Sequence, residues 1–136
     1  MSAPLFCLLY TSMIALEESP SCIVNILRVA RKHNESADIT GLLVFDGLHF
    51  CQYLEGSESA VLRLMERIRE DKRHGCISVI QQEAFEGTRR FNNWSMGYAL
   101  ATDENELRVL LDASEIPAIV RLQQLLPKLS MEPDLL

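Results

Sequence analysis

Short apolar runs alternate with amphipathic segments along most of the chain. Residues 5–12 form an apolar run after Pro4, which is typical of a strand buried on both faces. Ser19 and Pro20 then match the N-cap and the first position of a helix. Apolar residues follow at steps of three and four, which predicts a helix to about residue 34. These residues are Ile23, Ile26, Leu27 and Ala30.

The pair Asp46-Gly47 separates two β-rich runs, at residues 39–45 and 48–55. An Asp-Gly pair between two such runs is a strong signal for a tight hairpin, because both residues tolerate the backbone angles that the turn requires. We therefore predict that the two runs are paired antiparallel strands.

A second helix is predicted after Gly56-Ser57, with Gly75 as its stop. Its apolar stripe is Val61, Leu64, Met65 and Ile68. Two more apolar runs, at 77–85 and 94–101, extend the element order to β-α-β-β-α-β-β. This order predicts an α+β fold of the ferredoxin-like kind, with one sheet and both helices on one of its faces.

The segment at 102–136 differs in kind, because it contains two amphipathic stretches with no strand between them. The apolar positions are Leu107, Leu110 and Leu111, then Ile116, Ile119, Val120, Leu122 and Leu126, with Pro127 closing the second stretch. Such short helices are stable only when they cover apolar surface. We therefore expect a C-terminal helical extension on the other face of the sheet or against a second subunit, and we expect self-association.

Composition narrows the function classes. The chain has 136 residues, enough for one domain, and its formal charge of −6 disfavours tight nucleic-acid binding. We find no apolar run of transmembrane length and no signal-peptide pattern, so we expect a cytoplasmic protein without a membrane span. The cysteines lack metal-ligand and thioredoxin spacing, which predicts no metal site. They are Cys7, Cys22, Cys51 and Cys76.

Polar residues on apolar stripes are the candidates for chemistry. Asn34 ends the inward stripe of the first predicted helix, and Gln52 lies between two large apolar residues on one strand face. Tyr10 shares a strand face with Phe6 and Leu8. A buried polar group left without a hydrogen bond costs about 1–3 kcal/mol. Either Tyr10 and Gln52 satisfy one another and nothing more, or they belong to a ligand site.

The polar end of the second helix supplies three further candidates, Asp71, Arg73 and His74. They could converge with the buried polar residues in the space between the helices and the sheet. A gap walled by Ile26 and Ile68, one from each helix stripe, would suit a flat aromatic ligand. The chain has no glycine-rich phosphate loop to hold the nucleotide part of such a ligand.

Six segments together resemble BLUF domains, the blue-light sensors that use FAD. They are Leu9-Tyr-Thr-Ser12, His33-Asn34, Ile39-Thr-Gly-Leu-Leu-Val-Phe45, Phe50-Cys-Gln-Tyr-Leu-Glu-Gly56, Asp71-Lys-Arg-His74 and Arg90-Phe-Asn-Asn-Trp-Ser-Met-Gly97. The resemblance implies a flavin-binding photosensor domain at residues 1–101. It also implies that FAD, or alternatively FMN or riboflavin, is held between the two helices.

The resemblance further implies roles for single residues. Tyr10 would donate an electron and a proton to the excited flavin, and Gln52 would lie between that phenol and flavin N5 and O4 and then rearrange. Asn34 would bond the N3/O4 edge and Arg73 the O2 side. The ring or the ribityl chain would be lined by Ile26, His33, Phe50, Ile68, Asp71 and His74. Trp94 and Met96 would be the switch pair on the last strand, and the signal would pass through the C-terminal helices to a partner protein.

Two other functions stay open at this point. The chain could be a ferredoxin-like ligand-sensing or interaction module without photochemistry, in which Tyr10, Gln52 and Asn34 are satisfied core residues. A small hydrolase would need a nucleophile and a base, but Ser12, Cys51 and His49 have no evident triad arrangement. We therefore expect no enzymatic activity.

Overall fold

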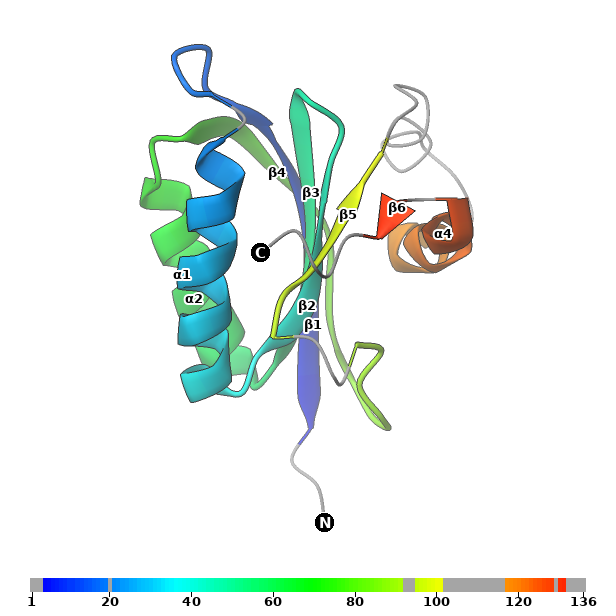
Figure 1. Ribbon diagram of the computed structural model, residues 1–136. Helices are drawn as coiled ribbons and strands as arrows, with labels where there is room; N and C mark the ends of the chain where they lie inside the picture. The colour runs from blue at the N-terminus through cyan, green and yellow to red at the C-terminus, as the bar shows by residue number, and fades with distance from the viewer. Residues whose placement is uncertain (1–3, 20, 92–94, 102–116, 129, 132–136) are drawn as a thin grey trace.

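The computed structural model describes residues 4–19, 21–91, 95–101, 117–128 and 130–131. In chain order its elements are β1 (Leu5–Ile14), α1 (Cys22–Ala37), β2 (Thr40–Phe45), β3 (His49–Gly56), α2 (Glu58–Glu70), β4 (His74–Phe85), β5 (Gly97–Leu100), α4 (Ala118–Leu125), a 3-10 turn (Leu126–Lys128) and β6 (Ser130–Met131). The strands form one mixed sheet in the order β4-β1-β3-β2-β5-β6. Helices α1 and α2 cover one face, called here the near face, and α4 covers the far face (Figure 1). The predicted ferredoxin-like α+β arrangement is confirmed.

Strand β1 lies in the interior of the sheet, between β3 and β4, and pairs antiparallel with both. The register with β3 sets Tyr10 directly opposite Gln52. Strand β1 is buried along most of its length, as its apolar run predicted. Because side chains alternate between the two faces of a strand, this pairing brings both polar residues to the same face.

The predicted hairpin is confirmed between β2 and β3. The Asp46 carboxylate accepts hydrogen bonds from the backbone N–H groups of Leu48, at 2.9 Å, and His49, at 2.6 Å. Gly47 has φ +100°, an angle that side-chain-bearing residues rarely adopt. Hydrogen bonds between near neighbours therefore stabilise the turn that joins β2 to β3.

Both helix starts were predicted, but only the second is at the expected residue. Helix α1 begins at Cys22 with Ser21 as its N-cap, so the prediction of Ser19 as the cap was wrong. Ser19 instead forms a turn before the helix, in which its carbonyl oxygen accepts from the Cys22 N–H at 2.9 Å. Helix α2 begins as predicted, since the Ser57 hydroxyl accepts from the Ala60 N–H at 3.3 Å.

The predicted end of α2 at Gly75 was wrong, because the helix ends at Glu70 and Gly75 lies in β4. Asp71 leaves the helix in an extended conformation. The imidazole of His74 lies 2.7 Å from the Ile68 carbonyl oxygen, near the C-terminal end of α2. A side chain that satisfies a helix-end carbonyl thus takes the place of the expected glycine stop.

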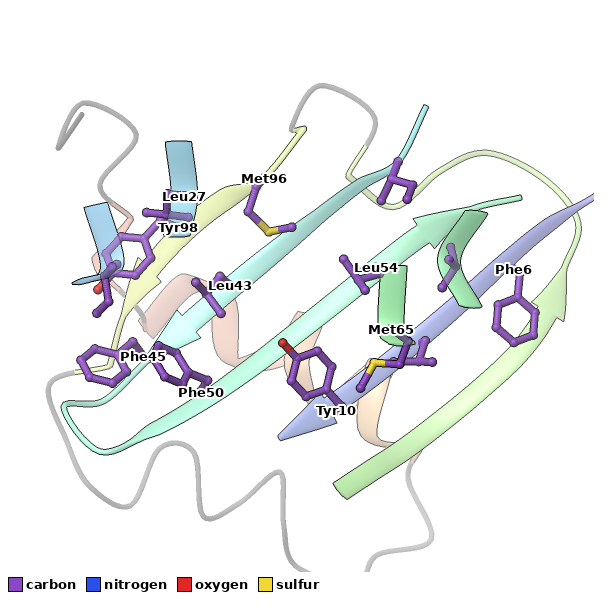
Figure 2. Packing of buried hydrophobic residues seen from close by; sticks show 14 residues of the cluster. Phe6, Tyr10, Leu27, Leu43, Phe45, Phe50, Leu54, Met65, Met96 and Tyr98 are labelled. Atoms are coloured by element: carbon purple, nitrogen blue, oxygen red, sulfur yellow. The ribbon is translucent and has the colours of Figure 1, made fainter. Parts of the chain in front are cut away.

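Each face of the sheet has its own apolar core. The near-face cluster joins sheet residues to inward residues of α1 and α2, and includes Tyr10, Leu54 and Met96 (Figure 2). The far-face cluster joins the opposite side chains of the same strands to α4, among them Tyr53 and Leu122. The two surfaces of β1 and β3 therefore belong to different packing environments.

Helix α4 packs on the far face of its own sheet, through Ala118, Ile119, Leu122 and Leu125. This is one of the two arrangements predicted for the second amphipathic stretch. The predicted stripe was wrong at Val120, which is 39% exposed. The first stretch lies outside the described residues, with Leu107, Leu110 and Leu111. Ile116 of the second stretch also lies outside them.

We expect Leu122→Ala to lower the free energy of unfolding by about 2–5 kcal/mol, because it removes a buried side chain between α4 and the sheet. Urea unfolding followed by circular dichroism measures the change. Val120→Ala is the matched control on the same helix, and its effect should stay within about 0.5 kcal/mol. Equal losses in the two variants would contradict the packing described for α4.

Candidate functional site

A cavity of about 220 Å³ lies between α1, α2 and the near face of the sheet. Its described lining residues are Tyr10, Ile26, Val29, Ala30, Asn34, Leu43, Phe50, Gln52, Leu64, Arg67, Ile68, Asp71, Arg73 and His74. The helices supply mainly aliphatic walls, whereas the amides and the phenol come from the floor and from one end of α1. An apolar cleft with a few convergent polar groups is the usual form of a small-molecule site.

Tyr10 and Gln52 form the polar floor of the cavity. Tyr10 is 3% exposed and Gln52 is 6% exposed, and the phenol donates a hydrogen bond to Gln52 Oε1. Burial raises the pKa of the Tyr10 phenol, and the Cys51 thiol and the Asp71 carboxylate raise it further. The phenol therefore keeps its proton at neutral pH, so Tyr10 is the donor and Gln52 the acceptor.

Gln52 also contacts the segment that leads into β5. Its Nε2 lies 3.5 Å from Met96 Sδ, and Met96 is 2% exposed on the near face. Figure 2 shows Met96 on the same side of the sheet as Tyr10. Gln52 thus joins Tyr10 on one side to Met96 on the other. Trp94, predicted as the partner of Met96, lies outside the described residues.

Asn34 is fully buried at the α1 wall of the cavity. Its Nδ2 donates to the Ser95 carbonyl oxygen at 2.7 Å. Its Oδ1 is buried and accepts no hydrogen bond from any described residue. Leaving such an acceptor unsatisfied costs about 1–3 kcal/mol. A ligand that offers an N–H group to Asn34 would remove that cost.

Arg31 is a residue of the site that the sequence did not reveal. Its Nε donates to the Met96 carbonyl oxygen at 2.9 Å, so α1 holds residues 95 and 96 through two side chains. Its spacing could have revealed it, because a residue three positions before Asn34 lies on the same side of the helix as Asn34.

Asp71 and Arg73 form a bidentate ion pair at the polar end of the cavity, with Nη2 and Oδ2 2.6 Å apart. Hydrogen bonds from the Arg73 side chain hold the pKa of the Asp71 carboxyl below its usual range, although burial opposes that shift. Both side chains line the cavity, as predicted. Their mutual pairing fixes a charged rim beside the apolar walls.

His33 lies beside the cavity, but it is not among the described residues that line it. It borders a neighbouring hollow together with Arg67, whose Nη1 lies 3.0 Å from His33 Nδ1. Burial and the Arg67 charge lower the pKa of His33, so the neutral ring accepts this hydrogen bond. Arg67 lines both the cavity and this hollow.

His74 has one defined tautomer. Its Nε2 lies 2.7 Å from the Ile68 carbonyl oxygen, which can only accept, so Nε2 carries the proton. In the neutral ring Nδ1 then accepts from the Ser12 hydroxyl at 2.7 Å. The ring meets both Tyr10 and Phe50 edge to face, with centroids 6.3 Å apart in each pair. His74 thus packs against the floor of the cavity.

The residues considered for a hydrolase are not brought together. Ser12 contacts His74, whereas His49 Nδ1 lies 3.1 Å from Asp46 Oδ2 in the hairpin turn. Cys51 lies in the far-face core, and burial raises the pKa of its thiol to about 12.

Within the described residues no cluster of His, Cys, Asp and Glu could hold a metal ion. No helix in the described ranges is long and apolar enough to cross a membrane.

Comparison with known proteins gives one consistent result. The chain matches the BLUF family, described as sensors of blue-light using FAD, over residues 5–97. It is 39% identical over 67 residues to the "Blue light- and temperature-regulated antirepressor BluF" of Escherichia coli (strain K12), covering 49% of this chain and 17% of that protein. It is 43% identical over 76 residues to "Photoactivated adenylate cyclase subunit alpha" of Euglena gracilis, covering 56% of this chain and 8% of that protein. The chain therefore spans less than a fifth of either curated relative.

A solved structure agrees over nearly the whole chain. "BlrB - a BLUF protein, dark state structure" has a TM-score of 0.76 and 34% sequence identity, and the alignment covers 92% of this chain and 96% of that one.

The buried phenol of Tyr10 predicts a pH dependence of stability. Its pKa is raised in the folded protein, so the unfolded chain, which ionises near pH 10, releases the proton first. The contribution of Tyr10 is complete below that pH and is lost as the pH rises. We expect Tyr10→Phe to weaken the decline of unfolding free energy above about pH 10 by up to about 1.4 kcal/mol per pH unit. Urea unfolding at a series of alkaline pH values measures this, and an unchanged decline would contradict it.

Proposed function

Because this chain belongs to the BLUF family, the sensors of blue-light using FAD, we propose that it binds FAD in the cavity between α1 and α2 and works as a blue-light photoreceptor. The observation that carries the proposal is the set of buried polar groups around that cavity. Tyr10 and Gln52 are hydrogen-bonded to each other, whereas the Asn34 Oδ1 acceptor has no described partner.

The lining residues fit an isoalloxazine ring. Aliphatic walls from both helices suit the faces of a flat ring, and amides suit its polar edge. Flavin N3–H is a donor of the kind that Asn34 Oδ1 lacks. Arg73 offers a guanidinium group to a carbonyl such as O2. We expect the other lining residues to contact the ring or the ribityl chain, and we expect His33 to contact it from the neighbouring hollow. These lining residues are Ile26, Phe50, Ile68, Asp71 and His74.

When bound, the flavin supplies a chromophore that absorbs blue light and becomes an electron acceptor when excited. Tyr10 is the oxidisable group of the site. Its O–H points at Gln52 Oε1, so an electron lost from the phenol leaves a proton with an acceptor already in hydrogen-bond contact. Gln52 would therefore lie on the path of that proton from the phenol toward the flavin.

Gln52 is the group that changes its hydrogen bonds. Its amide carries one acceptor and one donor end, which point at Tyr10 and Met96 respectively. Turning the amide would exchange which end faces the ring edge, whereas tautomerising it would change which end donates. A stronger bond to O4 would shift the absorption to longer wavelength. We assign the switch role to Gln52 and Met96, with Trp94 as a predicted partner.

A change at Gln52 would have to reach a surface of the protein that a partner can contact. Met96 leads directly into β5, and the far side of the same sheet is covered by α4. We propose that rearrangement at Gln52 reaches the C-terminal extension through this strand. The relatives named above are an antirepressor and a cyclase subunit, so we propose a downstream signalling protein as the partner here. The boundary at residue 101 between the photosensor domain and the C-terminal extension stays a prediction, and so does self-association.

The first test is a visible spectrum with and without blue light. We expect a yellow protein whose absorption shifts reversibly to longer wavelength. Tyr10→Phe and Gln52→Leu should keep the flavin and lose the shift, because each removes one group of the switch. Tyr98→Phe, a buried tyrosine of the same near-face cluster, is the matched control and should keep it. A protein that is colourless even after reconstitution with FAD would favour the interaction module without photochemistry instead.

The second test measures flavin affinity. We expect Asn34→Ala to weaken flavin binding by about tenfold or more, because it removes an acceptor for a buried ring N–H. Fluorescence titration of the apoprotein with FAD measures the dissociation constant. Asn25→Ala, an exposed asparagine of the same helix, is the control and should bind as the wild type does. Equal affinity in the two variants would remove Asn34 from the flavin site.

A further inference from the structure

Glu55 is a carboxylate that the proposed photochemistry does not use. It is fully buried near the end of β3, on the far face, whereas the cavity lies on the near face. It accepts hydrogen bonds from four donors among the described residues. Oε1 accepts from the Phe91 N–H at 2.8 Å and the Thr40 hydroxyl at 3.2 Å, and Oε2 from the Tyr53 hydroxyl at 2.9 Å and the Arg90 N–H at 3.1 Å. Two of these donors are backbone groups of the connection between β4 and β5.

The charge of Glu55 is balanced through Tyr53. Arg90 Nη1 donates to the Tyr53 hydroxyl at 2.7 Å, and that hydroxyl donates in turn to Glu55. The Arg90 guanidinium also lies 4.6 Å from the centre of the Phe85 ring. The Phe91 ring meets Tyr53 edge to face at 5.3 Å. Residues 90 and 91 are therefore fixed to the sheet through their backbone and their side chains.

The other end of the same connection is held from the opposite face. Asn34 and Arg31 donate to the carbonyl oxygens of Ser95 and Met96, at 2.7 Å and 2.9 Å. The connection is thus tied to β3 at residues 90–91 and to α1 at residues 95–96. Met96 follows Phe91 by five positions, so the two anchors lie close together in the sequence.

We propose that Glu55 is a positioning residue for the switch, one that sets where Met96 meets Gln52 by anchoring the backbone of residues 90 and 91 to the far face. The inference rests on the proposed photoreceptor function for its spectroscopic consequence, while its structural consequence is independent of light.

A carboxylate suits this position because every group around it is a donor. Each oxygen accepts two hydrogen bonds, and a carboxylate has no proton to place against an N–H. A glutamine of the same shape offers one oxygen and sets its NH₂ against one backbone N–H, that of Phe91 or that of Arg90, although the hydroxyl beside it can turn to accept. Glu55→Gln therefore loosens the anchor without changing the volume of the core or any group that lines the cavity.

The experiment compares Glu55→Gln with Glu66→Gln, which removes the same charge from an exposed position on α2. Backbone hydrogen exchange in the dark should accelerate about tenfold at residues 95–100 in Glu55→Gln, with β1 and β3 unchanged. The variant should keep its flavin and its red shift, but recover in the dark at a rate changed by about threefold or more, because Met96 contacts Gln52 differently. Glu66→Gln should match the wild type in both measurements.

Tyr53→Phe is the second variant and remains informative where Glu55→Gln does not fold. It removes the hydroxyl between Arg90 and Glu55 but keeps the ring against Phe91, so exchange at residues 95–100 should rise about threefold. Wild-type exchange there in every variant that folds would overturn the proposal. An equal acceleration throughout the sheet would also overturn it, since that is a general loss of stability. Absence of any light response in the wild type would refute the photoreceptor function, while dark exchange would still decide the role of Glu55.

Discussion

The hydrogen bond between Tyr10 and Gln52 depends on the antiparallel register of β1 and β3, and the rest of the site is arranged around it. In that register the two residues are direct neighbours on the near face. A slip of one residue would move Gln52 and every other side chain of β3 to the opposite face. The apolar residues on both faces of these strands make such a slip costly, so packing of the two cores protects the geometry of one polar pair.

The two faces of the sheet hold buried polar groups of different kinds. On the near face Asn34 Oδ1 has no described donor, in a cavity lined by both helices. On the far face every oxygen of Glu55 is satisfied by described donors. An unsatisfied acceptor beside a cavity indicates a ligand, whereas a saturated carboxylate indicates a structural anchor. Both act on the same segment, because one holds residue 95 and the other holds residues 90 and 91.

Local patterns predicted most of the fold and part of the site. The Asp46-Gly47 turn and the start of α2 after Gly56-Ser57 were correct, because each depends on hydrogen bonds between near neighbours. The end of α2 was wrong, because His74 bonds a carbonyl of the helix and the chain leaves it before Gly75. The stripe of α4 was wrong at Val120, since the angle at which a short helix meets a sheet is decided by the surface that it covers.

By itself the sequence determined on which face of its strand or helix a polar residue such as Tyr10, Gln52 or Asn34 lies, because strand and helix periods act over a few residues. Tyr10, Gln52 and Asn34 could thus be singled out as polar groups on buried stripes. Only the tertiary structure decided which of them touch, which acceptor lacks a donor, and that Arg31 and Glu55 hold the segment before β5. Those facts depend on distances between residues far apart in the chain, as with Glu55 and Phe91. No local period encodes such distances, because they arise only when sheet, helices and connections pack together.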